Sequence, residues 1–133
     1  MNNNGINSHK DLDVWKKSLH LVTDIYRLTE NFPEDEIYGL IAQMKRAAVS
    51  IPSNIAEGAS RNSGKEFIQF LYIALGSASE LETQLIISQK LSYIDNREAE
   101  NYQERIEMLK KTLTGLITYL KKASIYLRNP LTD

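Results

Sequence analysis

The sequence predicts an all-α fold: an antiparallel, up-down-up-down four-helix bundle with a kinked second helix. Two observations carry this prediction. Apolar residues recur at alternating steps of three and four along four long segments, and Pro, Gly, Asn and Asp signals separate these segments. No segment shows the alternation of a β-strand. Long helices joined by short connections fold back on one another as a bundle.

The chain of 133 residues is long enough for one domain with its own core. We place the bundle domain at residues 11–129 and expect a disordered, asparagine-rich tail over residues 1–10. The chain has no cysteine, which excludes disulfides and cysteine nucleophiles and fits a reducing cytoplasm. Because there is no signal peptide and no apolar run long enough for a bilayer, we expect a cytoplasmic protein without a membrane role.

The first helix is predicted to begin near Asp11 or Asp13, either of which can cap it, and to end before Pro33. Its predicted core positions follow the three-four pattern: Leu12, Trp15, Leu19, Val22 and Tyr26.

The second helix contains Pro52 within its apolar pattern, so we expect a kink or a short break there. Ser50, Ser53 and Asn54 are expected to bond carbonyl groups that the proline leaves free. Gly58 is expected to end the helix as a C-cap residue. The predicted core positions are Ile37, Ile41, Met44, Ala48, Ile51 and Ile55.

The third helix is predicted to start with a capping box, Ser63 with Glu66. Gly76 lies among small residues in mid-helix; because glycine costs ~1 kcal/mol of helix propensity relative to alanine, we expect close helix packing there. The run from Phe67 to Leu75 is apolar nearly all round and predicts self-association, the alternative being a wide core with partly exposed aromatic side chains. The predicted core positions are Phe67, Leu71, Ala74, Ala78, Leu81, Leu85 and Ser88.

The fourth helix is predicted to start with a second capping box, Asp95 with Glu98, and to stop at Asn129 and Pro130. Its predicted core positions are Tyr102, Ile106, Leu109, Leu113, Leu116, Leu120, Ala123 and Leu127.

The net charge is only −1, but cations and anions are unevenly placed. Glu34, Asp35 and Glu36 make one end acidic, whereas no acidic residue occurs from Met108 to Asn129. The two lysine pairs of that segment are eleven residues apart, which returns them to one helix face. These charges predict either a solvated face or a nucleic-acid site. The cations are Lys110, Lys111, Lys121, Lys122 and Arg128.

The sequence offers no arrangement typical of catalysis or of a cofactor. His9 and His20 are the only histidines and neither belongs to a Glu-x-x-His metal motif, and no phosphate-binding loop or nucleophile elbow is present. We therefore predict no enzyme, no metal and no cofactor.

Three carboxylates, Glu57, Glu80 and Glu82, are the candidates for acid–base work. The alternative, which we favour, is a partly buried polar cluster in which Glu80, next to Ser77 and Gln84, pairs with Arg46 or Arg61.

The segment Arg46–Arg61, with SIPSNIAEG at residues 50–58, is followed by Glu66-Phe67 and by ALGSASELE at residues 74–82. Together these strings resemble the 23S rRNA intervening sequence proteins, and DVWKKS at residues 13–18 is similar to the start of that family. The resemblance covers residues 11–127 and implies a bacterial protein, a left-handed bundle, a homopentameric ring and no enzymatic activity. A related branch, the accessory protein of diversity-generating retroelements, binds nucleic acid and a reverse transcriptase; it is strongly basic, whereas this chain is nearly neutral.

Two functional hypotheses follow. In the first, the protein is a non-enzymatic homo-oligomeric adaptor that binds RNA or a nucleoprotein partner through Lys110, Lys111, Lys121, Lys122 and Arg128. In the second, it is a protein–protein interaction scaffold without a nucleic-acid role, whose contact surface includes Arg46, Asn54 and Arg61.

Overall fold

The computed structural model describes residues 8–128, with the backbone alone for Asp11 and for residues 124–128. Within these residues the chain is all helical, which confirms the predicted fold class; the left-handed sense of the bundle and the domain boundaries stay predictions. No described helix has both the length and the apolar character needed to cross a membrane. The helices are α1 (Asp13–Thr29), α2 (Leu40–Ala59), α3 (Gly64–Lys90) and α4 (Asn96–Arg128), with short 3-10 helices at His9–Asp11 and Glu34–Glu36.

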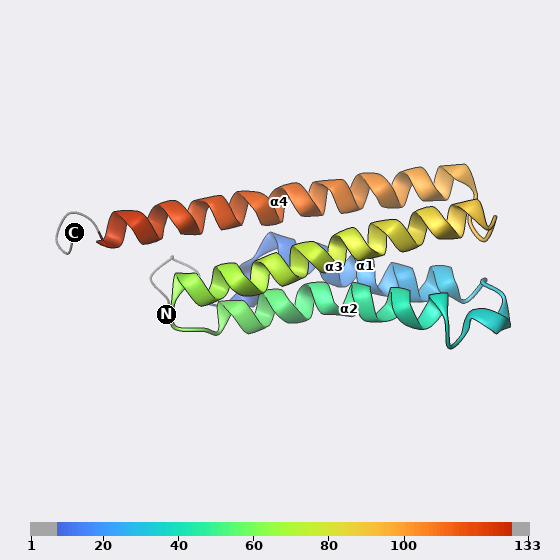
Figure 1. Ribbon diagram of the computed structural model, residues 1–133, viewed down its shortest axis with the longest axis horizontal. Coiled ribbons are helices and arrows are strands. Elements are labelled where there is room, and N and C mark those ends of the chain that lie inside the picture. Colours follow the sequence, from blue (N-terminus) through green and yellow to red (C-terminus); the bar gives the residue numbers. More distant parts are fainter. Residues whose placement is uncertain (1–7, 129–133) are drawn as a thin grey trace.

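The four α-helices lie side by side along one long axis, and α4 extends beyond the others at the end where the chain finishes (Figure 1). Between α2 and α3, Ser50 Oγ lies 2.7 Å from Ser77 Oγ, and Ser88 Oγ donates to Met44 Sδ over 3.6 Å. Later residues of α3 thus meet earlier residues of α2, so these two helices run in opposite directions. The broad packing surfaces are α2 on α3 and α3 on α4, whereas α1 meets α4 only along a narrow line.

The core face of α1 differs from the predicted one. The side chains of Leu19 and Tyr26 are 39% and 41% exposed, and the cap position is Leu12, without a side-chain cap, so the predicted aspartate cap is also wrong. Ser18 belongs to the buried row because its hydroxyl donates to the Trp15 carbonyl over 2.7 Å, which satisfies it without water. The buried row is Val14, Ser18, Leu21, Ile25, Leu28 and Thr29.

In α2, Ile41, Met44, Ala48, Ile51 and Ile55 are buried as predicted. The sixth predicted core residue, Ile37, is 48% exposed and lies before the helix begins, so its assignment to the core is wrong.

The helix continues unbroken through Pro52, so the predicted break does not occur, and the kink stays a prediction. Gly58 is not a C-cap residue: it is a buried residue inside α2, which ends at Ala59 with Ser60 as its cap. A Cβ atom at Gly58 would come within 2.8 Å of Phe70 Cβ and 2.9 Å of Phe67 Cδ1. Gly58 therefore permits the close approach of α2 and α3 that we had expected at Gly76.

In α3, all seven predicted core residues are buried. Ser63 Oγ accepts the Glu66 backbone N–H over 3.2 Å, as the capping box predicts, and the Glu66 carboxylate bonds the Ser63 hydroxyl over 3.1 Å. The expectation for Gly76 is wrong, because a Cβ atom there would meet no atom within 4 Å. The glycine lies on the outer face of α3.

The second predicted capping box is confirmed at the start of α4, where the Glu98 N–H donates to Asp95 Oδ1 over 2.8 Å. Tyr102, Ile106, Leu109, Leu113 and Leu120 are buried as predicted. The predicted Leu116 and Ala123 are only partly buried, and Ile117 takes the core position instead. The Leu127 side chain and the predicted stop at Asn129 and Pro130 lie outside the described part.

The two glycines make a matched pair. Gly58→Ala should lower the free energy of unfolding by about 1–3 kcal/mol, because its methyl group overpacks the α2–α3 contact. Gly76→Ala should raise it by up to about 1 kcal/mol, because alanine favours the helix and has open space. Urea unfolding at one fixed protein concentration measures both. A Gly58→Ala variant as stable as the wild type would contradict the close approach.

Candidate functional site

The predicted basic face of α4 is split between two environments. Lys110 Nζ lies 3.3 Å from Glu82 Oε1 of α3, with both side chains about one-third exposed or less. Lys121 Nζ donates to the Tyr72 hydroxyl over 2.9 Å and lies 5.4 Å from the centre of that ring. Both lysines therefore contact α3, whereas Lys111 and Lys122 are exposed on the outer side. The side chain of the fifth predicted residue, Arg128, lies outside the described part.

The three residues of the second predicted surface have different surroundings. Asn54 Nδ2 donates to the Ser50 carbonyl and to Ser50 Oγ over 2.8 and 2.9 Å. The Arg61 guanidinium pairs with Glu57 at 3.0 Å and lies 5.0 Å from the centre of the Phe70 ring. Arg46 lines a solvent-accessible pocket. The interaction surface of Arg46, Asn54 and Arg61 stays a prediction.

A shallow polar pocket of about 260 Å³ lies between α2 and α3. Glu80, Ser77 and Arg46 line it together, but the structure gives no ion pair between the described side chains of Glu80 and Arg46, and Arg61 pairs with Glu57. Near it, Gln84 is only 4% exposed, and its Oε1 accepts no hydrogen bond from the described residues. The pocket lining is Gln43, Arg46, Ala47, Ser50, Ser77 and Glu80.

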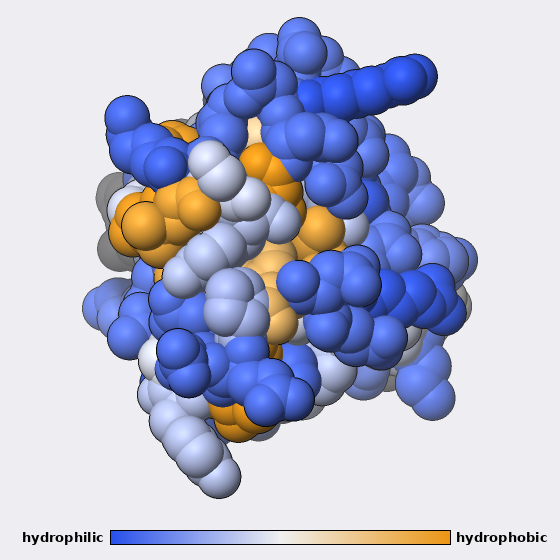
Figure 2. All heavy atoms as spheres, turned by 90° about the vertical axis from the view of Figure 1, so that its right-hand side faces the viewer, coloured by the Kyte–Doolittle hydropathy of each residue, from blue (hydrophilic) through white to orange (hydrophobic). Residues whose placement is uncertain are grey.

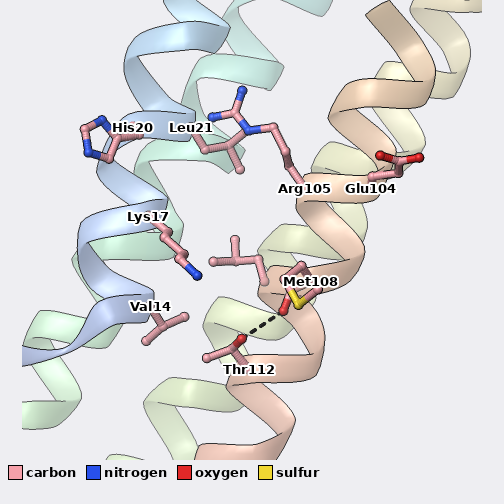
Figure 3. A pocket seen from close by; sticks show the side chains of 9 residues that line it. Val14, Lys17, His20, Leu21, Glu104, Arg105, Met108 and Thr112 are labelled. Atoms are coloured by element: carbon pink, nitrogen blue, oxygen red, sulfur yellow. Dashed lines mark hydrogen bonds between the residues drawn. The ribbon is translucent and has the colours of Figure 1, made fainter. Parts of the chain in front are cut away.

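Sequence reasoning missed a groove of about 330 Å³ between α1 and α4 (Figure 3). At one end of the groove, polar contacts join α1 to α4, and we call them the clamp. Arg105 Nη2 lies 2.9 Å from Asp24 Oδ2, and the Tyr102 hydroxyl donates to the Asp24 carbonyl over 3.2 Å. Beyond the clamp the helices leave a slot with an apolar floor. The sequence signal that could have indicated this groove is Met108, an apolar residue outside the predicted core positions of the fourth helix. The lining is Val14, Lys17, His20, Leu21, Glu104, Arg105, Met108, Leu109 and Thr112.

Apolar side chains are also exposed on two other faces. A third hollow, of about 280 Å³, lies between α1 and α2, where Trp15, Leu19 and Val22 meet Val49 and Pro52. On α3, four large apolar side chains are more than one-third exposed: Tyr72, Ile73, Ile86 and Ile87. The end of the bundle that carries the α1–α2 and α3–α4 connections shows apolar atoms among a polar surround (Figure 2).

Comparison with known proteins decides the family. The model of the family described as 23S rRNA-intervening sequence protein matches residues 10–115, which include α1, α2, α3 and more than half of α4. The chain belongs to this family. The match ends before Lys121, Lys122 and Arg128, so the second half of the basic face lies outside the matched residues.

A solved structure supports the same assignment. It is a protein of unknown function from the S23 ribosomal protein family of Bacteroides thetaiotaomicron, 30% identical in sequence, with a TM-score of 0.71. The similarity covers 78% of this chain and 97% of the other. Among curated proteins, no relative was found. The family and this neighbour do not establish a biochemical function.

The α1–α4 clamp should be sensitive to alkaline pH. Burial raises the pKa of Tyr102 above its usual value of 10.0, and the neighbouring Asp24 raises it further. A pKa that is higher in the folded protein than in the unfolded chain gives stability that is complete below pH 10.0 and is lost as pH rises through the folded pKa. Tyr102→Phe should therefore lose ~0.5–1.5 kcal/mol of unfolding free energy near neutral pH, from the missing hydrogen bond, but decline less in alkali.

Urea unfolding at pH ~8 and pH ~11 measures this difference between the wild type and Tyr102→Phe. Tyr119→Phe, a change at an exposed tyrosine of the same helix, controls for the titration of other groups. A gap between wild type and Tyr102→Phe that stays constant from one pH to the other would contradict the prediction.

Proposed function

We propose that the protein is a non-enzymatic, self-assembling bundle that binds RNA, alone or within a nucleoprotein, through the outer face of α4. The observation that carries this proposal is the exposure of Lys111 and Lys122 on one face of a helix segment without acidic residues. At ~1.5 Å per residue their eleven-residue spacing is about 16 Å, so the two ammonium groups can contact separate phosphates of one strand.

The other two lysines of the face have different roles in this proposal. Lys110 is held by Glu82 and is partly neutralised, so it contributes little to phosphate binding. Lys121 lies beside Tyr72, whose ring is 46% exposed. A cation beside an exposed aromatic ring is a combination that suits single-stranded RNA, because bases stack on the ring while the cation meets the backbone.

Self-assembly would increase the affinity for RNA, because one chain alone offers few exposed lysines. The exposed apolar residues lie on two different faces, the α1–α2 hollow and the outer side of α3. Contacts between unlike faces of identical subunits are heterologous and close into rings when the rotation allows. A ring, of five copies if the family resemblance holds, repeats the lysine face around its circumference. We place this assembly in the cytoplasm.

The scaffold hypothesis has less support, because Asn54 is hydrogen-bonded within α2 and Arg61 is already paired with Glu57. Its remaining feature is the Arg46 pocket, which would be the contact point for a protein partner.

Binding to a fluorescent single-stranded RNA tests the proposal. The double variant Lys111→Gln/Lys122→Gln should bind at least about tenfold more weakly at ~50 mM salt, because two phosphate contacts per chain are lost. The slope of log K against log salt should also become shallower by about 1.4 for each chain that contacts the RNA, since each phosphate on a single strand contributes ~0.7.

The matched control is Lys65→Gln/Lys90→Gln, which removes the same charge from exposed positions of α3. Equal weakening by both double variants would indicate a general charge effect and would contradict an α4 site. Absence of RNA binding by the wild type at low salt would remove the proposed function and leave the scaffold hypothesis.

A further inference from the structure

The α1–α4 groove has the features of a small-molecule site rather than of a packing defect. Its volume of about 330 Å³ falls within the range of ligand pockets, and helix bundles often place such pockets between helices. Val14, Leu21, Met108 and Leu109 supply its apolar lining, and the other lining residues carry polar groups: Lys17, His20, Glu104, Arg105 and Thr112. A slot that combines an apolar lining with polar groups suits a ligand that has both an apolar part and a polar part.

The groove exists because only one end of the α1–α4 contact is tied. The Asp24 clamp with Arg105 and Tyr102 holds the helices together at that end. About two to three turns earlier in α1, Lys17 and Val14 face Met108 and Thr112 of α4, and among these described residues the structure gives no hydrogen bond or ion pair from one helix to the other. The Thr112 hydroxyl is satisfied within its own helix, by donating to the Met108 carbonyl over 2.9 Å.

The charges around the groove favour an anion. The Arg105 charge is compensated by Asp24 at 2.9 Å. Among the described residues, the one ion-pair partner of Lys17 is Asp13 at 3.8 Å, and with side chains 62% and 81% exposed such a pair holds the ammonium weakly. Figure 3 shows the Lys17 ammonium directed toward the groove, whereas the Glu104 carboxylate points away from α1. Lys17 is therefore available to a ligand.

We propose that this groove binds a small, monomeric, amphipathic carboxylate, whose aliphatic body lies on Val14, Leu21 and Leu109 and whose carboxylate pairs with the Lys17 ammonium. Met108, at 57% exposed, covers the aliphatic body from the α4 side. The site is independent of the RNA face, because Lys111 and Lys122 do not line it.

The methionine methyl groups allow ligand binding to be measured by NMR. The chain has three methionines, Met1, Met44 and Met108; Met44 is fully buried in the core and Met108 lines the groove. In protein labelled with carbon-13 at the methionine methyl groups, sodium decanoate below its micelle concentration should shift the Met108 signal saturably. The Met1 and Met44 signals should stay in place.

The charge requirement is tested with decyltrimethylammonium, which has the same chain length and the opposite charge. It should bind at least about tenfold more weakly than decanoate, and Lys17→Glu should reverse this preference. Lys16→Glu, the same change at an exposed neighbour that does not line the groove, should leave it unchanged. Thr112→Trp, which fills the groove without changing charge, should abolish the Met108 response.

The proposal is overturned if decanoate leaves the Met108 signal unmoved, or if both amphiphiles shift it equally. It is also overturned if Lys16→Glu and Lys17→Glu have the same effect. Circular dichroism of each variant, compared with the wild type, establishes that a lost response comes from the groove and not from unfolding.

Discussion

The burial of α3 between α2 and α4 is the constraint on which the rest of the structure depends. Its predicted seam is buried along its whole length, and six of its seven residues are completely inaccessible: Leu71, Ala74, Ala78, Leu81, Leu85 and Ser88. Burying one large aliphatic side chain stabilises the fold by ~1.5–3 kcal/mol, so this seam fixes the position of both neighbours. α1, by contrast, is attached through α2 and through one clamp to α4, and the groove beside that clamp is a consequence.

Periodicity predicted the helices and three of the four core faces, because long apolar seams leave little choice of face. It failed in α1 because that helix carries two apolar rows one position apart. The predicted row contains Trp15 and Tyr26, and the other row contains Ser18. The structure buries the row with Ser18, since a serine that bonds its own helix backbone can be buried at little cost. The polarity of serine alone does not show that its hydroxyl will bond the backbone of its own helix.

The features of the site that could not be predicted are those that depend on contacts between different helices. The sequence identified Lys110 and Lys121 as cations but could not show that Glu82 and Tyr72, 28 and 49 residues away, would engage them. The two glycines illustrate the same limit. Both lie inside helices, but of the two only Gly58 faces a neighbouring helix closely enough to require the absence of a side chain. The capping boxes were predictable because all their atoms lie within four residues.

The apolar surface that a single bundle leaves exposed is central to the function we propose. Large apolar side chains remain exposed on α3 and beside the α1–α2 hollow, and we infer that further copies of the chain cover them. Sedimentation velocity at micromolar concentration tests this inference most directly. We expect a single particle several times heavier than the 15.2 kDa chain, and Ile73→Lys with Ile87→Lys on the outer face of α3 should reduce it to the single chain. A wild-type particle of 15.2 kDa would contradict the account.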